Sequence, residues 1–231
     1  LFEKTTTLGG QLNIACVPPR KEEMRRAAQD LIHAVCNAGV HLCIGQTRTA
    51  EQLKDAGFEA VINAVGAHSA APRIPGIDSV NVADAWKVLA GEQQVYGTVA
   101  VIGGGLTGCE IAYELALQGK QPVIVEMKND LIAQTGVCLA NSSYLREWFA
   151  WKKVPVYLET TLQEVKDDSI VCKDASGKEI TIPCDSVISS AGYIPNPLAP
   201  KGSNVSLVGD CDGVGNLRSV VWRAYEVAMK I

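Results

Sequence analysis

The sequence predicts an α/β fold in which two parallel sheets, each with its own crossover helices, occur along one chain. Short apolar runs alternate with segments of helical periodicity, a pattern typical of parallel strands joined by helices. Breaks rich in Pro and Gly stand at residues 71–76 and 191–197, and a fresh strand–helix–strand unit lies between them. We therefore expect residues 76–192 to form one domain, inserted into another made of residues 1–75 and 193–231.

The first domain is expected to begin with a short strand that ends on Glu3 and is followed by a turn at residues 8–11. Residues 21–37 carry apolar side chains at helical spacing and predict a helix. Strands are expected at 40–44, where His41 alternates with apolar neighbours, and at 59–64. A strand at 205–208 and a helix at 217–230 are expected to complete this domain.

In the inserted domain a strand at 98–102 leads through a glycine-rich loop into a helix that ends near Gln118. The remaining elements expected there are strands at 122–126, 154–158, 162–166, 169–173, 179–182 and 185–189, and a helix at 143–152. Residues 174–177 read Asp-Ala-Ser-Gly and predict a hairpin turn. Such a hairpin unit between α/β elements predicts an antiparallel layer over one face of the parallel sheet.

The composition is that of an ordinary globular protein and argues against several classes of function. Of 231 residues, 47% are hydrophobic and 20% are charged, and the net charge of -4 offers no basic surface for nucleic acid or an anionic membrane. No apolar run approaches the ~18 residues that would span a bilayer. We expect a cytoplasmic protein.

The cysteines and histidines predict no metal site. No C-x-x-C pair occurs, and the histidines (His33, His41 and His68) lack ligand spacing. We expect buried free thiols in a reducing compartment. The eight cysteines are Cys16, Cys36, Cys43, Cys109, Cys138, Cys172, Cys184 and Cys211.

The strongest chemical signal is the segment VIGGGLTGCE, a Gly-x-Gly-x-x-Gly loop directly after a strand and at the head of a helix. Gly103 permits the sharp turn, and Gly105 lets the backbone approach a pyrophosphate. Gly108 allows the helix to press against the sheet. The phosphates would lie at the positive end of the helix dipole. The alternative is a glycine-rich turn that serves packing only.

An acid at the end of the next strand strengthens this interpretation. Glu126 is placed to accept hydrogen bonds from ribose hydroxyls, and it would repel a 2′-phosphate. The motif therefore predicts a site for NAD(H), with NADP(H) less favoured. Lys128 lies close enough to reduce that discrimination.

Glu3 repeats the pattern of Glu126, because it too ends a strand. It is expected to be the ribose-binding acid of an earlier dinucleotide-binding unit whose first strand and glycine loop would lie upstream of Leu1. The alternative is a surface acid at a strand end.

Two nested Rossmann-like folds, together with the segment LGGQLNIACVPPRKEEM, resemble the C-terminal FAD/NAD(H) module of 2,4-dienoyl-CoA and 2-enoate reductases. These are old yellow enzyme-related NADH:flavin oxidoreductases. The resemblance implies three-layer ββα folds, with an NAD-type domain inserted into a truncated FAD-type domain. It also implies an upstream barrel of the same polypeptide, with FMN and an iron–sulfur cluster expected only outside this chain.

The resemblance assigns roles to residues of the first domain. Glu3 is implied to bind the FAD adenosine ribose, and Gly9, Gly10 and Gln11 to pass near the flavin. Gly66 is implied to form a small-residue turn close to the cofactor.

Near the C-terminus, Gly209 and Asp210 resemble the GD motif whose Asp reaches the FAD ribityl chain. The helix from about Asn216 is implied to point its N-terminus at the isoalloxazine, where it would stabilise the anionic reduced flavin. Without the resemblance, Gly209 and Asp210 read as a plain strand-to-loop turn.

The resemblance implies an electron-input module that passes hydride from NAD(P)H to FAD, and no acid–base catalyst is expected within it. A flavoprotein disulfide reductase is disfavoured by the missing C-x-x-C pair. A non-catalytic ADP-binding scaffold like that of trimethylamine dehydrogenase-like proteins stays open, as does a stand-alone pyridine nucleotide–flavin reductase.

Overall fold

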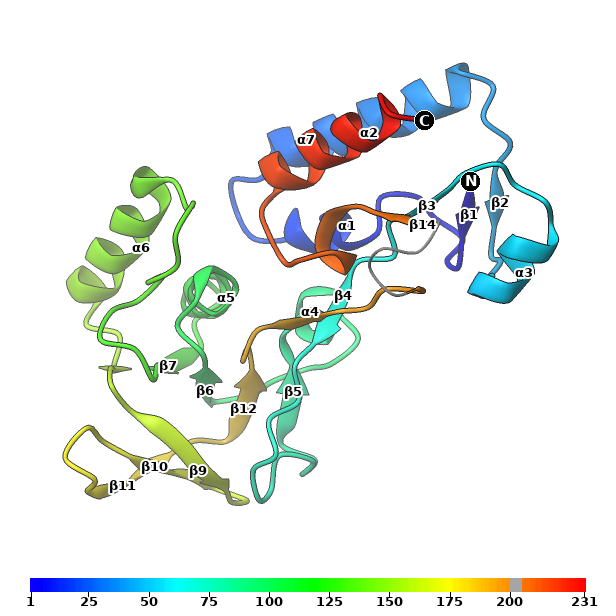
Figure 1. The fold of residues 1–231 in the computed structure, drawn as a ribbon. Helices are drawn as coiled ribbons and strands as arrows, with labels where there is room; N and C mark the ends of the chain where they lie inside the picture. Colours follow the sequence, from blue (N-terminus) through cyan, green and yellow to red (C-terminus); the bar gives the residue numbers. More distant parts are fainter. Residues whose placement is uncertain (200–204) are drawn as a thin grey trace. The chain divides into compact units, whose positions relative to one another are not determined.

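A computed structural model describes residues 1–199 and 205–231 (Figure 1). The described chain separates into two compact units. The first consists of Leu1–His68 and Tyr193–Ile231, and the second of Ser69–Gly192. The second unit is therefore an insertion between two segments of the first.

The second unit is built around a five-stranded parallel sheet with the order β5-β12-β6-β7-β8. Its central strand, β6, lies at the middle of the unit, and Val99, Ala100 and Val101 within it are fully buried. The elements of this unit are β5 (Val82–Asp84), α4 (Ala85–Leu89), β6 (Thr98–Ile102), α5 (Leu106–Leu117), β7 (Gln121–Val125), α6 (Leu139–Lys152), β8 (Val156–Tyr157), β9 (Thr161–Val165), β10 (Ser169–Lys173), β11 (Glu179–Pro183) and β12 (Ser186–Ser189).

Three layers make up the second unit. An antiparallel sheet, β11-β10-β9, covers one face of the parallel sheet, while α5 and α6 lie on the other (Figure 1). Ala100, Val123 and Val187 of the parallel sheet share one buried apolar cluster with Ile170 and Ile182 of the antiparallel sheet. The expected ββα layering is therefore confirmed.

The first unit contains short two-stranded pairs. Strands β1 and β2 pair in parallel, as do β3 and β14, and β4 pairs with β13. Its elements are β1 (Phe2–Glu3), α1 (Gln11–Ala15), α2 (Glu22–Asn37), β2 (Cys43–Ile44), α3 (Ala50–Asp55), β3 (Val61–Asn63), β4 (Ala67–Ser69), β13 (Tyr193–Pro195), β14 (Val205–Leu207), η1 (Gly209–Cys211) and α7 (Leu217–Ala228). The pairing of β14 with β3 confirms that the C-terminal strand belongs with the first part of the chain.

One expected strand is much shorter than the sequence predicts. Only Cys43 and Ile44 of residues 40–44 are in β2, so the prediction that His41 is a strand residue is wrong. The paired residues are Phe2 with Cys43 and Glu3 with Ile44. Beyond them the N-terminal amine of Leu1 still donates to the His41 carbonyl at 2.7 Å, so His41 lies beside β1 although it is outside β2.

The hairpin turn at residues 174–177 is confirmed. Asp174 Oδ1 accepts hydrogen bonds from the amides of Ser176 and Lys178, and Gly177 N donates to Asp174 O. Because one carboxylate satisfies the exposed turn amides, these four residues reverse the chain between β10 and β11.

Candidate functional site

The glycine loop connects β6 to α5 at the carboxyl end of the parallel sheet. Gly103 has a φ of 108°, in the region that favours glycine, and it turns the chain directly after Ile102. Gly105 is the N-cap of α5 and has extended backbone, so no side chain caps the first turn in the described structure. A helix N-terminus without a side-chain cap is a place where an anionic acceptor is favoured.

The three motif glycines have different steric reasons. A Cβ on Gly103 would overlap the carbonyl oxygen of Ser190, and a Cβ on Gly108 would overlap the carbonyl oxygen of Gly103. At Gly105 the nearest atom to an added Cβ is Gln134 Oε1, at 3.3 Å. Packing therefore explains Gly103 and Gly108, whereas Gly105 leaves backbone open to a close ligand such as a pyrophosphate.

The buried carboxylate of Glu126 joins the end of β7 to the glycine loop. Its Oε2 accepts a hydrogen bond from Gly104 N at 2.6 Å, and its Oε1 accepts one from Lys128 N at 2.8 Å. Only 7% of the residue is exposed. Each carboxylate oxygen retains a further lone pair, so the same group can also accept from a ribose hydroxyl.

The backbone carbonyl of Gly104 is held as well. Its carbonyl oxygen accepts from Ile132 N at 2.7 Å and from Cys109 Sγ at 3.3 Å. Burial, with a smaller contribution from the Glu126 charge, raises the pKa of Cys109 to about 12. The thiol is therefore protonated at neutral pH and acts as a hydrogen-bond donor.

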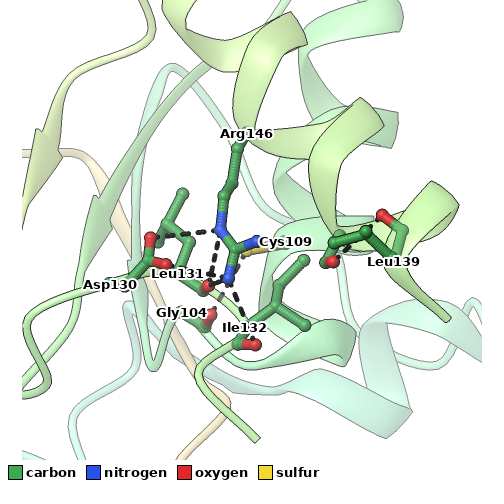
Figure 2. A network of polar contacts seen from close by, with 8 residues as sticks. Gly104, Cys109, Asp130, Leu131, Ile132, Leu139 and Arg146 are labelled. Carbon is green, nitrogen blue, oxygen red and sulfur yellow. Dashed lines mark hydrogen bonds and ion pairs between the residues drawn. The ribbon is translucent and has the colours of Figure 1, made fainter. Parts of the chain in front are cut away.

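A guanidinium on α6 binds the segment that follows Glu126 (Figure 2). Arg146 donates to the carbonyl of Leu131 from Nη2 at 2.6 Å and from Nε at 3.0 Å. It also pairs with the Asp130 carboxylate, with 2.9 Å between Nη2 and Oδ2. A longer contact of 3.5 Å reaches the Ile132 carbonyl.

In the first unit, Glu3 lies at the end of β1, as Glu126 lies at the end of β7. Glu3 Oε1 accepts from the backbone amide of Thr5 and from the Thr5 hydroxyl, each at 2.8 Å. Glu126 accepts the amide of Lys128 in the same way, two residues further along the chain. Both acids therefore close the same small ring with the backbone.

The structure brings Gln11 and Gly66 together. Gln11 Nε2 donates to Ala67 O at 2.7 Å, and a Cβ on Gly66 would lie 2.9 Å from that nitrogen. Gly9 and Gly10, which precede α1, both have positive φ. The expected turn at residues 8–11 therefore leads directly into a short helix.

The remaining predicted residues lie next to α7. Gly209 and Asp210 form the start of η1, and Asp210 Oδ1 accepts from Gly215 N at 3.0 Å. Helix α7 begins after its N-cap residue, Asn216. The Asn216 side chain accepts from Ser219 N, and the Ser219 side chain accepts from Asn216 N. Asp210 thus shapes the turn that leads to the expected helix start.

The expectation of buried thiols is correct in part. All eight cysteines are free, but Cys36 and Cys138 are exposed and Cys43 is half-buried. The prediction of burial is wrong for Cys36, because Ala28 is the one buried residue of α2. The prediction of burial is also wrong for Cys138, which is the N-cap of α6 and lies outside the packed part of that helix. No group of metal-ligating side chains occurs within residues 1–199 and 205–231.

Sequence reasoning missed Gly104, Ile132 and Arg146. Gly104 is the middle glycine of Gly103-Gly104-Gly105, so the sequence does display it. In the structure a Cβ on Gly104 would lie 2.6 Å from Leu131 Cδ2. The contact of Arg146 with Leu131 spans fifteen residues and joins a helix to a loop. No local pattern signals such a contact.

This layered architecture, with a glycine loop and a strand-ending acid, is typical of pyridine nucleotide- and flavin-dependent oxidoreductases. Residues 13–213 match the family described as pyridine nucleotide-disulphide oxidoreductase, and the chain belongs to that family. The family binds FAD and NAD(P)H.

Two curated relatives are reductases. The chain is 42% identical over 217 residues to a bilirubin reductase of Mediterraneibacter gnavus, covering 92% of this chain and 33% of the relative. It is 32% identical over 237 residues to a cinnamate reductase of Clostridium sporogenes, covering all of this chain and 35% of the relative. The chain therefore spans about a third of the length of these relatives. The expected resemblance to flavin-dependent enoate reductases is confirmed.

Solved structures show the same fold. A 2-naphthoyl-CoA reductase superposes with a TM-score of 0.88 at 24% identity, covering all of this chain and 36% of that one. A histamine dehydrogenase from Rhizobium sp. 4-9 gives 0.81 at 18% identity, covering all of this chain and 40% of that one. Within the described residues no helix is long and apolar enough to cross a membrane.

Proposed function

We propose that the chain is the electron-input module of a flavin-dependent enoate or dienoyl-CoA reductase-like enzyme. The observation that carries the proposal is the Gly104–Glu126 hydrogen bond, which fixes the loop beside Gly105, where among the described residues only the Gln134 side chain comes within 4 Å of an added Cβ. The named activities of the bilirubin and cinnamate reductases support a reductase of conjugated substrates.

The second unit is the proposed NAD(H)-binding domain. The backbone at Gly105 and the N-terminus of α5 receive the pyrophosphate, and Glu126 accepts from the adenosine ribose. A buried anion at this position disfavours a 2′-phosphate, so NADH is the preferred donor over NADPH. Lys128, two residues further on, limits the size of that preference.

The first unit is the proposed FAD-type domain. Glu3 binds the adenosine ribose, Asp210 the ribityl chain, and the α7 N-terminus at Asn216 faces the isoalloxazine. Gly9, Gly10, Gln11 and Gly66 line the approach to the flavin. Bound FAD supplies the hydride acceptor, while the chain positions it and stabilises its charge.

Other parts of the enzyme complete the activity. We assign FMN, the iron–sulfur cluster and the residues that reduce the substrate to an upstream barrel domain of the same polypeptide. The eight free thiols support a reducing location such as the cytoplasm. The proposed module itself contributes no acid–base catalyst, since hydride transfer requires positioning rather than proton transfer.

The competing candidate is a non-catalytic ADP-binding scaffold, a function that the same fold can serve. Titration of the protein with NADH and with ADP separates the two. An input module binds NADH more tightly than ADP, and in the complete enzyme NADH reduces the flavin. Equal affinity for both ligands, with no flavin reduction, would overturn the proposal.

A further inference from the structure

Arg146 is the cation that holds the segment connecting Glu126 to α6. Its guanidinium contacts the Leu131 carbonyl twice (Figure 2). It also contacts the Asp130 carboxylate twice, from Nε to Oδ1 at 3.1 Å and from Nη2 to Oδ2 at 2.9 Å. The Arg146 side chain is 30% exposed and that of Asp130 51%, so the carboxylate keeps much of its contact with water. The carbonyl contact is therefore the part of the interaction that fixes the backbone.

The held segment lies against the middle of the glycine loop. Ile132 N donates to Gly104 O at 2.7 Å, and Leu131 Cδ2 fills the space where Gly104 lacks a side chain. Ile132 has a φ of 51°, a conformation that a β-branched residue rarely adopts. Arg146 binds the carbonyl on each side of this residue, at 2.6 Å to Leu131 and 3.5 Å to Ile132.

We propose that Arg146 is a positioning residue of the nucleotide site. By holding Leu131 and Ile132, it keeps the Gly104 peptide in place, and so keeps the adjoining Gly105 backbone ready for a pyrophosphate. This inference rests on the proposed binding of NADH by the second unit.

The geometry of guanidinium explains why this position carries arginine. Its planar fork has five N–H donors, so it can serve a carbonyl and a carboxylate at once. A lysine ammonium can pair with Asp130 but cannot reproduce the two donors that converge on one carbonyl oxygen. Lysine at this position retains the charge but loses the pair of hydrogen bonds to the Leu131 carbonyl.

The test compares Arg146→Lys with the matched control Arg26→Lys. Arg26 pairs with Glu23 at 2.8 Å on α2, and its side chain is 71% exposed. Affinity is measured for NADH, ADP and adenosine, because the first two carry a pyrophosphate and adenosine carries none. The second readout is alkylation of Cys109, which is 0% exposed and donates to Gly104 O. Its rate, followed by mass spectrometry, reports opening of the loop without any ligand.

We expect Arg146→Lys to lower the affinity for NADH and for ADP by about tenfold, which corresponds to about 1.4 kcal/mol of binding free energy. Adenosine affinity stays unchanged, alkylation of Cys109 accelerates, and Arg26→Lys behaves like the parent protein. Asp130→Asn keeps the carbonyl contacts and should change both readouts less than Arg146→Lys does.

Two results would overturn the inference. One is an unchanged Cys109 alkylation rate together with unchanged NADH affinity. The other is an equal loss for all three ligands with a lower melting temperature, which would mark a purely structural role. If the parent protein does not bind NADH, the proposed function fails on its own, and the alkylation rates still decide whether Arg146 holds the loop.

Discussion

Gly104 and Glu126 are joined by a hydrogen bond of 2.6 Å between a backbone amide and a buried carboxylate, across 22 residues of chain. The carbonyl of the same glycine is held by Ile132 N and Cys109 Sγ. The backbone N–H and the backbone C=O of Gly104 are therefore both satisfied without any ligand. The acid that is proposed to read the ribose also fixes the loop that is proposed to hold the phosphates.

Replacing Glu126 with Ala should weaken NADH binding by about 1–3 kcal/mol, because a charge-assisted hydrogen bond to the ribose is lost. NADPH should lose less, so that the preference for NADH narrows. Titration of both nucleotides measures the change. Glu147, an exposed acid on α6, provides the matched control as Glu147→Ala. An unchanged cofactor preference in Glu126→Ala would refute the assignment of the ribose acid.

Gly108→Ala should destabilise the protein by about 1–3 kcal/mol, the usual effect of overpacking a filled site. The added Cβ would overlap the Gly103 carbonyl, so α5 must move away from β6. Gly213→Ala is the control, since nothing lies within 4 Å of a Cβ there. Thermal unfolding of both variants measures the difference. Equal melting temperatures would show that α5 does not depend on this close contact.

The stability of the protein should fall at alkaline pH. Burial raises the pKa of Cys109 to about 12, and the pKa values of Cys172 and Cys184 to about 11, from an ordinary value of 9.0. Unfolded thiols lose their protons above pH 9.0 while the folded ones retain them. Stability from these groups is thus complete below pH 9.0 and is lost as the pH rises toward about 11 to 12.

Urea unfolding across this alkaline range measures that loss. Cys109→Ala should show a shallower decline with pH, because one raised pKa is removed. The exposed Cys138 serves as the control, and Cys138→Ala should decline as the parent protein does. Identical slopes for Cys109→Ala and the parent would contradict the burial of a protonated thiol behind the loop.

The purified chain should retain little FAD. Next to Glu3, the described residues of the first unit contain no loop like that from Gly103 to Gly108. The FAD pyrophosphate would therefore lack the backbone amides that such a loop supplies. Flavin absorbance after gel filtration measures the bound fraction, with a sample reloaded with FAD as the comparison. A yellow protein with one flavin per chain would show that the first unit binds FAD without such a loop.

Strong periodicity and local geometry made part of the fold predictable. The strand at 98–102 has the expected bounds, and α5 ends one residue before Gln118, because a buried strand and a long apolar helix leave clear patterns. In the structure, β6 and β7 pair in parallel, so the glycine loop and Glu126 follow their strands at the same edge of the sheet. The NAD and FAD roles of the site residues stay predictions.

Short elements were less accessible. Helix α3 was missed although Thr49 and Gln52 form a capping box, a signal that the sequence displays. Strand β4 has three residues and no alternation of its own. The hydrogen bonds from Arg146 to the Leu131 carbonyl could not be predicted from the sequence for a different reason. They depend on how α6 packs, and packing is a property of the assembled unit rather than of a sequence window.

The two strand-ending acids also differ in how their contacts form during folding. The ring between Glu3 and Thr5 closes over two residues, and a loop of that length has a small closure entropy. The bond between Glu126 and Gly104 spans 22 residues and requires β6, α5 and β7 to be in register first. The glycine loop is therefore expected to reach its final shape late, when the parallel sheet around it is complete.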